Sequence, residues 1–248
     1  MIRIASAAAV LSAIILLTRS RDRGGLRGRF TRGNVLSAFF LFGYAICFSF
    51  AYLGLTTATG ALILFGCVQA TMLIYGLAKG ERPGALEWIG LAVALGGLVY
   101  LVFPGLESPS LISTLLMAAA GIAWGFYTLR GKGSSDPVAQ TAGNFILAVP
   151  FVLLASVPFV GGFFFTSYGV LWAVLSGAVA SGIGYSVWYA ALRGHTSSSA
   201  AVVQLSVPVI AAAGGLVLLN ESLSVRLAIA SVLILGGIWL AVKGKSKK

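Results

Sequence analysis

Long apolar runs separated by short charged gaps are the feature that most constrains the fold of this chain. Backbone polar groups have no water partner in lipid, so a segment that crosses a bilayer is an α-helix or a strand of a closed barrel. Barrel strands alternate over about 10 residues, whereas these runs are uniformly apolar and close to the roughly 20 residues of a spanning helix. The sequence therefore predicts an all-α, polytopic transmembrane bundle of nine helices near residues 3–18, 34–54, 56–78, 85–103, 110–129, 138–157, 168–191, 197–219 and 225–242.

The composition agrees with lipid as the main solvent. Only 9% of the residues are charged and 58% are hydrophobic, whereas a soluble domain has roughly 25% charged residues. The first run is followed by a cluster of arginines rather than by a small-residue cleavage site, so we interpret it as a retained helix and not as a signal peptide.

The basic residues gather on one face of the predicted bundle. If the helices alternate in direction, 15 of the 17 Lys and Arg lie on that face, and only Arg3 and Arg226 lie on the other. The positive-inside rule makes the basic face cytoplasmic, with the C-terminus in the cytoplasm. The formal net charge of +11 is then a topology signal. No basic helix face with interleaved aromatic residues accompanies it, so we expect no nucleic-acid partner.

A weak internal repeat divides the chain. Gly80–Pro83 precedes a helix with Gly96-Gly97, and Asn220–Leu223 precedes one with Gly236-Gly237, at an offset of 140 residues. The pattern predicts two repeats, residues 1–105 and 106–248, built on a five-helix unit whose first helix is missing from the first repeat. Because five is odd, tandem units have opposite orientations, an inverted-repeat design that places a binding site at the repeat interface.

The chain resembles the EamA family of the drug/metabolite transporter superfamily over essentially its whole length. The matching features are Trp124 and Tyr127 before Arg130, the group Tyr185–Trp188–Tyr189, Pro208 within QLSVPVIAAAGGLVLLNESL, and the Gly236-Gly237 helix, with GERPGALEWIGLAVALGGLVYL at the corresponding end of the first repeat. The resemblance implies a multi-pass protein of a bacterial inner (plasma) membrane.

Two departures from the family pattern stand out. Family members usually have ten helices, and the first run here resembles their second helix, so we expect a truncated start or a fragment. The repeat places Val68 at the counterpart of Pro208, so a proline kink is expected on one side only.

Polar and aromatic side chains within the apolar runs are the candidate substrate-binding residues, because a buried amide in hydrocarbon is costly without a partner. Hydrogen bonds between helices explain such residues equally well, and the small residues beside them fit helix-packing stripes. Tyr44 is a further aromatic residue that could contact a substrate. The candidates that would line the cavity are Gln69, Trp124, Asn144, Tyr185, Trp188, Gln204 and Pro208.

Residues for enzymatic or metal chemistry are sparse. Cys47 and Cys67 lie within apolar runs, His195 is the only histidine, and no Cys/His cluster has metal-ligand spacing, so we expect no metal or cofactor. Glu81 and Glu221 lie in turns, where helix capping explains them. We find no carboxylate or base near the centre of a segment that would suggest proton coupling.

The resemblance implies a transporter, and we expect an exporter of a small metabolite such as an amino acid, working by alternating access around an uncharged cavity. The alternative is a non-transporting membrane scaffold or lipid-binding subunit; a membrane enzyme fits less well because acid–base pairs are absent. The expected partners are a small-molecule substrate and the lipid bilayer, and a homo-oligomer is left open.

Overall fold

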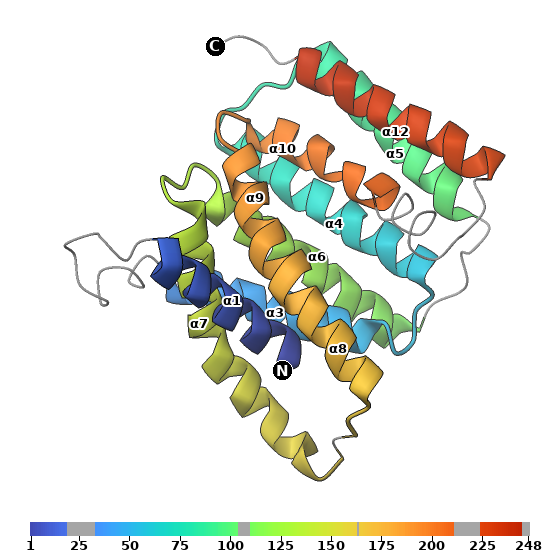
Figure 1. The fold of residues 1–248 in the computed structure, drawn as a ribbon. Coiled ribbons are helices and arrows are strands. Elements are labelled where there is room, and N and C mark those ends of the chain that lie inside the picture. Colours follow the sequence, from blue (N-terminus) through green and yellow to red (C-terminus); the bar gives the residue numbers. More distant parts are fainter. Residues whose placement is uncertain (19–32, 104–109, 163, 211–223, 245–248) are drawn as a thin grey trace. The chain divides into compact units, whose positions relative to one another are not determined.

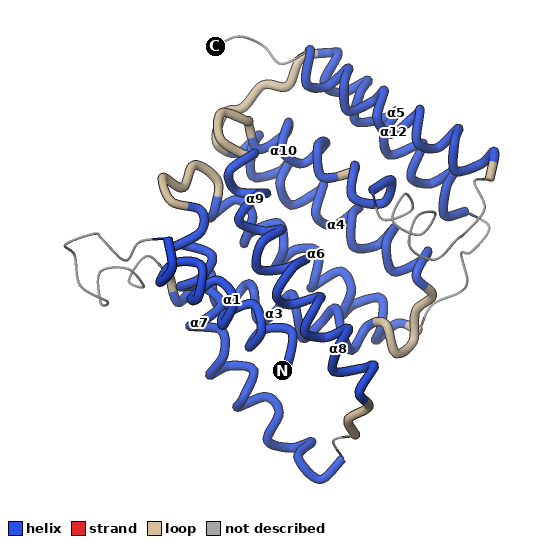
Figure 2. The backbone as a smooth tube through the Cα atoms, in the orientation of Figure 1, coloured by secondary structure: helices blue, strands red, loops and turns tan. Residues whose placement is uncertain are grey.

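The described part of the chain is helical throughout. The computed structural model describes residues 1–18, 33–103, 110–162, 164–210 and 224–244, and these residues form helices, turns and loops without a strand (Figures 1 and 2). The elements are α1 (Ile2–Thr18), α3 (Val35–Ala51), α4 (Thr57–Ala78), α5 (Ala85–Val102), α6 (Leu111–Gly131), α7 (Pro137–Ser156), η2 (Val157–Gly162), α8 (Ser167–Leu175), η3 (Ser176–Ile183), α9 (Gly184–Ala191), α10 (Ser197–Gln204) and α12 (Val225–Lys243).

Six helices are long and apolar enough to cross a membrane. They are Thr57–Ala78, Ala85–Val102, Leu111–Gly131, Pro137–Gly162, Ser167–Ala191 and Val225–Lys243. Three further apolar helices are shorter, namely Ile2–Leu17, Val35–Ala51 and Ser197–Ile210. Each predicted run thus contains helix. That the three shorter helices also cross the membrane, which would make nine spans, remains a prediction. Residues 211–219 of the predicted eighth span, and Glu221, lie outside the described residues.

Short polar side chains begin many of these helices. A Ser, Thr or Asp oxygen accepts a hydrogen bond from the backbone N–H three residues later, which satisfies one of the donors that a helix start leaves unpaired. The capping residues are Thr56, Asp136, Thr166, Thr196 and Ser224. Positive φ angles at Gly80, Gly133 and Gly194 let the chain turn after α4, α6 and α9.

The chain forms two compact units. Unit 1 comprises Met1–Ile46 and Phe126–Gly194, and unit 2 comprises Cys47–Gly125 and His195–Lys248. The boundaries fall within α3 and α6, so both helices contribute to both units. Each unit combines segments of both predicted repeats, 1–105 and 106–248, so neither repeat is a compact body by itself.

In unit 1, α1 packs against η3 and α7. Gly177 of η3 makes the close approach of α1 possible. A Cβ at this position would lie 2.1 Å from the carbonyl oxygen of Arg3 and 2.0 Å from Oγ of Ser6. Only glycine fits there without displacing α1, because real Cβ atoms do not approach other atoms so closely.

In unit 2, α5 and α12 lie side by side and antiparallel (Figure 1). Their glycines place the two backbones in direct contact. A Cβ on Gly237 would lie 2.6 Å from backbone atoms of Gly90 and Ala94, and a Cβ on Gly97 would lie 2.9 Å from the side chain of Ile234. We call this contact the glycine interface, and it follows the small-residue rule for helix packing in membranes.

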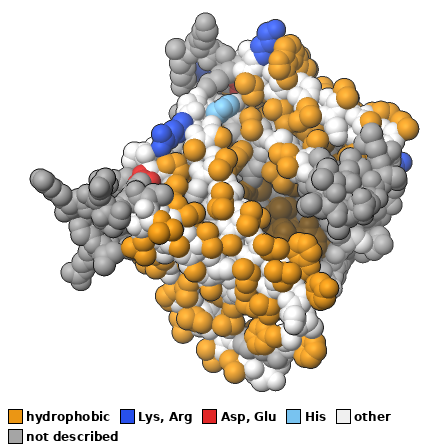
Figure 3. Space-filling view, viewed as in Figure 1, with side chains coloured by type: hydrophobic (Ala, Val, Ile, Leu, Met, Phe, Trp, Pro, Cys, Tyr) orange, Lys and Arg blue, Asp and Glu red, His pale blue; other side chains and the backbone are white. Residues whose placement is uncertain are grey.

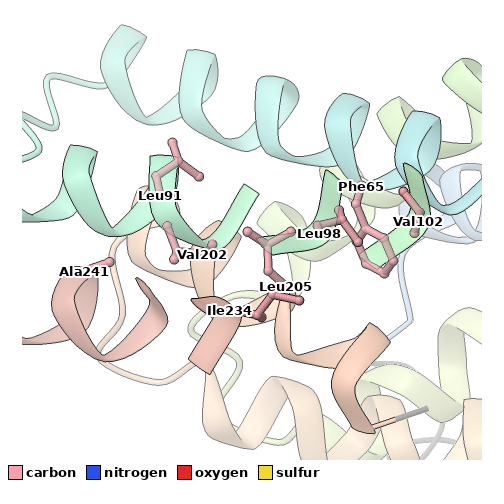
Figure 4. Packing of buried hydrophobic residues seen from close by; sticks show 9 residues of the cluster. Phe65, Leu91, Leu98, Val102, Val202, Leu205, Ile234 and Ala241 are labelled. Carbon is pink, nitrogen blue, oxygen red and sulfur yellow. The ribbon is translucent and has the colours of Figure 1, made fainter. Parts of the chain in front are cut away.

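An aliphatic cluster completes the core of unit 2 (Figure 4). Leu91 and Leu98 of α5 and Ile234 of α12 are buried together with Val202 and Leu205 from α10 and its C-terminal end. The glycine interface and this cluster therefore form one continuous apolar core.

Large apolar side chains also cover the outside. In Figure 3, hydrophobic side chains occupy most of the described surface in view, and Lys and Arg are few. Leu154, Ile112 and Val232 are 70%, 73% and 72% exposed. Such a surface suits hydrocarbon, since soluble monomers rarely expose large contiguous apolar patches.

Candidate functional site

A partly buried cationic cluster is the main polar feature of unit 1. Nε of Arg3 donates a hydrogen bond to Oγ of Ser181 at 2.9 Å, and Nη2 of Arg3 donates one to the hydroxyl of Tyr185, also at 2.9 Å. The guanidinium carbon lies 5.6 Å from the centre of the Tyr44 ring, within the range of a cation–π contact. We call Arg3, Tyr44, Ser181 and Tyr185 the Arg3 cluster.

The Arg3 cluster lies near the middle of a long helix. Gly177 and Ser181 flank the midpoint of the 25-residue apolar helix Ser167–Ala191. A helix of this length spans about 37 Å at about 1.5 Å per residue, against a hydrocarbon core of about 30 Å. The sequence alone puts Arg3 at the outer end of its run, but the structure puts its guanidinium beside the middle of this long apolar helix.

The helix that receives Arg3 is locally π-helical. Residues Ser176–Ile183 form η3, a wider turn between the regular α-helices α8 and α9. Oγ of Ser186 bonds back to the carbonyl of Gly182 at 3.0 Å. Short π-helical segments inside α-helices occur frequently at functional sites, and here the segment carries the Ser181 hydroxyl that holds Arg3.

Aromatic rings surround Tyr185. Its ring centre lies 5.8 Å from that of Phe145 and 6.3 Å from that of Tyr127. Tyr127 also packs edge-on against Tyr189 at 5.6 Å, and the Tyr189 hydroxyl donates to the carbonyl of Tyr127 at 3.1 Å. Gly131 leaves room for the Tyr189 ring, which a Cβ there would meet at 2.1 Å. The cationic group therefore has an apolar aromatic neighbourhood.

A second polar group in unit 1 is centred on Asn34. Its backbone N–H donates to Oδ1 of Asn144 at 2.9 Å, and its own Oδ1 accepts from Nη2 of Arg130 at 2.8 Å. Nε of Arg130 donates to Oγ of Ser37 at 3.0 Å. Asn144, predicted as a cavity residue or as a partner between helices, thus bonds to the segment that starts α3.

Two predicted residues of unit 2 lie on or against α10. Nε2 of Gln69 donates to the carbonyl of Ala201 at 2.6 Å. Oε1 of Gln69 and Oε1 of Gln204 are buried without a hydrogen-bond partner among the described residues. α10 ends at Gln204, four residues before Pro208, which has no N–H to bond the Gln204 carbonyl.

The remaining candidates are the buried Trp124 and the partly buried Trp188. Trp124 of α6 is 9% exposed and belongs to unit 2. Nε1 of Trp188, in unit 1, is buried without a partner in the described part of the chain. Unit 1 therefore contains Asn144, Tyr185 and Trp188, and unit 2 contains Gln69, Trp124, Gln204 and Pro208.

Arg3 and Ser181 were not among the candidates predicted from the sequence. Arg3 is the single charged residue in its apolar run, which is a usable signal because ionisable residues inside spanning segments are rare and usually functional. Its position at the end of the run concealed that signal.

The composition, the helices and the apolar surface define an integral, multi-pass α-helical membrane protein. The chain belongs to the EamA-like transporter family, which matches residues 111–243. It is therefore a membrane transporter with a small-molecule substrate and a lipid environment.

Similar proteins span most of the chain. An uncharacterized protein of Pseudomonas aeruginosa is 48% identical over 236 residues, covering 94% of this chain and 79% of that protein. An uncharacterized transporter of Archaeoglobus fulgidus is 30% identical over 219 residues, covering 83% and 74%. A protein of Salmonella typhimurium named "probable amino-acid metabolite efflux pump" is 26% identical over 228 residues, covering 82% and 76%.

A solved crystal structure has the same fold. It superposes with a TM-score of 0.76 at 22% identity and covers 98% of this chain and 86% of the solved chain. At this identity the similarity establishes the fold alone.

Proposed function

We propose that the protein exports a small metabolite, such as an amino acid or a related compound, across a bacterial inner membrane with its C-terminus in the cytoplasm. Membership of the EamA-like transporter family supports a transport function. The efflux-pump name of the Salmonella relative supports export as the direction and an amino-acid metabolite as the substrate class. Alternating access between two inverted repeats, residues 1–105 and 106–248, is the proposed mechanism.

The symmetry of the glycine interface is the structural observation that supports inverted repeats. Gly97 faces Ile234, and Gly237 faces Ala94. The offset of 140 residues converts one contact into the other, because it relates Gly97 to Gly237 and Ala94 to Ile234. Two antiparallel helices that exchange equivalent contacts are related by a local two-fold axis, as equivalent helices of opposite orientation are in an inverted repeat.

The proposed pathway residues are Gln69, Trp124, Asn144, Tyr185, Trp188, Gln204 and Pro208. Unpartnered buried atoms support three of them, namely Oε1 of Gln69, Oε1 of Gln204 and Nε1 of Trp188. Leaving a buried polar atom unsatisfied costs about 1–3 kcal/mol, so a ligand or water that bonds to these atoms restores that energy.

Proteoliposomes test this function. The purified protein is assayed with a panel of labelled metabolites, with and without a pH gradient, and we expect saturable flux of at least one of them. Replacing Gln204 by Leu removes the amide, and we expect the flux to fall several-fold. Val207→Leu, at an exposed position beyond α10, is the matched control and keeps the flux.

The same assay separates the alternative. A scaffold or lipid-binding subunit predicts no flux in the wild type and no functional change in Gln204→Leu. Saturable flux that is unaffected by Gln204→Leu and by Gln69→Leu would support the transport function. It would contradict a role of either amide in the proposed pathway.

A further inference from the structure

We propose that the Arg3 cluster is a binding subsite for the carboxylate of a small organic acid that has an apolar body. This inference rests on the proposed transport function and assigns one part of its substrate to named side chains. It also replaces the uncharged cavity expected from the sequence with one that carries a fixed positive charge.

The charge of Arg3 has no anionic partner in the described part of the chain. Ser181 and Tyr185 are neutral hydrogen-bond acceptors, and Tyr44 offers a ring face. Asp136 is the single carboxylate among the described residues of unit 1, and its Oδ1 accepts from the N–H of Ala139 at the start of α7. An arginine beside the middle of a membrane-spanning helix normally pairs with an anion or faces a polar pathway, so an anionic ligand is the missing complement.

Hydrogen bonds fix the guanidinium and leave part of it available. A guanidinium has five N–H donors; Nε bonds to Ser181 and Nη2 to Tyr185, and Tyr44 is a further side-chain hydrogen-bond partner. The Arg3 side chain is only partly buried. A carboxylate binds an arginine best through two parallel N–H donors, and a guanidinium held in one plane presents such a pair without further ordering.

The backbone is built to bring Arg3 to this position. Gly177 lets the first turn of α1 lie against η3, because any side chain there would collide with the carbonyl of Arg3. Ser181 and Tyr185 are four residues apart and project from the same face of the helix toward α1. The π-helical turn, the glycine contact and the two hydrogen-bond acceptors thus converge on one guanidinium.

The surroundings specify the rest of the ligand. The Tyr185 ring lies against Phe145 and Tyr127, so apolar ring surface borders the cation. A highly hydrated ion such as inorganic phosphate would lose its water beside these rings with little compensation. A carboxylate attached to an apolar body satisfies both the guanidinium and the rings.

Direct binding to the purified full chain in nanodiscs tests the subsite independently of transport. The probes are benzoate, its neutral isostere benzamide, and inorganic phosphate. We expect the wild type to bind benzoate at least about tenfold more tightly than benzamide or phosphate, which corresponds to one charge-assisted interaction. Arg3→Gln should abolish that preference, and Arg3→Lys should restore part of it because a point charge replaces the planar fork.

Matched variants separate ligand binding from a purely structural role of Arg3. Tyr185→Phe keeps the ring and removes the hydroxyl that positions Arg3, so the benzoate preference should decrease while benzamide affinity stays unchanged. Arg130→Gln removes an equal charge from the Asn34 group and should keep the full preference. If Arg3→Gln is not monodisperse, Arg3→Lys and Tyr185→Phe decide the question.

Two results would overturn the subsite. One is wild-type protein that binds benzoate no better than benzamide, or binds phosphate equally well. The other is a benzoate preference that survives in the Arg3 and Tyr185 variants. An absence of flux for every metabolite in proteoliposomes would instead contradict the proposed transport function. The binding measurements would still show whether the Arg3 cluster binds a carboxylate.

Discussion

The two compact units achieve cohesion by different means. In unit 1, arginines reach between helices, with Arg3 bonded to Ser181 and Tyr185 and Arg130 bonded to Asn34 and Ser37. In unit 2, glycines bring α5 and α12 into backbone contact, and an aliphatic cluster fills the remaining space. Both units pack closely, so the difference lies in the arginine side chains that bond between the helices of unit 1.

This difference separates stability from ligand recognition. Between membrane helices there is little hydrophobic driving force, so close packing supplies much of the association energy. The glycine interface meets that need without any polar group. Holding the charge of Arg3 between helices adds an energetic cost, and the proposed subsite assigns that cost to an interaction with a substrate.

Crowding the glycine interface should be the most damaging change. In Gly237→Val, the new Cβ would lie 2.6 Å from backbone atoms of Gly90 and Ala94, which cannot move aside as a flexible side chain can. We expect the yield of monodisperse protein in detergent to collapse, because overpacking between rigid backbones costs about 3 kcal/mol or more. Fluorescence-detected size-exclusion chromatography after a temperature series measures the effect.

The neighbouring glycine provides the control for that variant. A Cβ on Gly236 would meet no atom of another element within 4 Å. Gly236→Val should therefore leave the thermal midpoint nearly unchanged. Equal losses in both variants would show that the helix backbone itself, and not the contact with α5, requires glycine.

The second prediction concerns the close contact in unit 1. Gly177→Ala would place a Cβ 2.1 Å from the carbonyl oxygen of Arg3, so α1 must shift away from η3. We expect a lower thermal midpoint and, in addition, a reduced preference for benzoate over benzamide. A stability loss with the full preference retained would show that Arg3 does not depend on the contact between α1 and η3.

Gly184, on the same long helix, is the control position. A Cβ there would lie 3.6 Å from the carbonyl of Val179, an ordinary contact distance. Gly184→Ala should be neutral or stabilising by up to about 1 kcal/mol, since alanine favours helix over glycine.

A double-mutant cycle measures the weaker polar contact of unit 1. Nε of Arg130 donates to Oγ of Ser37 at 3.0 Å, but the Arg130 side chain is exposed. We expect a coupling of about 1 kcal/mol or less between Arg130→Gln and Ser37→Ala, in line with a single hydrogen bond. Ser156→Ala removes only a bond within its own helix and serves as the reference. Strict additivity would show that the Asn34 group adds nothing to the cohesion of unit 1.

The sequence was sufficient to predict the helical segments. Apolar runs of spanning length can be recognised from contiguous sequence alone. The expected ranges 56–78 and 85–103 agree closely with Thr57–Ala78 and Ala85–Val102. The family was predictable for a similar reason, since its motifs lie within single segments such as that around Trp124 and Tyr127.

The surroundings of the candidate residues were not predictable, because they depend on how separate segments meet. The surroundings of Arg3 follow from the start of α1 facing the middle of another helix. The π-helical turn at η3 has no distinctive residue pattern that sequence analysis could have used. Asn144 was recognised as a polar residue, but its partner, the N–H of Asn34, lies 110 residues away.

The smallest expected effect belongs to the carboxylate of unit 2. Glu81 lies in the turn after α4, where the sequence suggested a helix cap, and it caps the start of α10. Its oxygens accept from the N–H of Ser197 at 2.7 Å and from the N–H of Ser198 at 3.1 Å, and the Ser198 hydroxyl adds a bond at 2.9 Å. Burial alone would raise the pKa of Glu81, but these hydrogen bonds outweigh it and hold the pKa below its ordinary value.

This shift predicts the pH dependence of stability. A carboxyl whose pKa is lower in the folded state stabilises the fold above its unfolded pKa, about 4.3 for glutamate. That stabilisation is lost as the pH falls through the folded-state value. We expect the melting temperature of the wild type to decrease when the pH is lowered below about 4.3. Glu81→Gln should weaken that pH dependence and should lower the melting temperature slightly at neutral pH. Parallel pH profiles for the two proteins would mean that the cap of α10 contributes no pH-dependent stability.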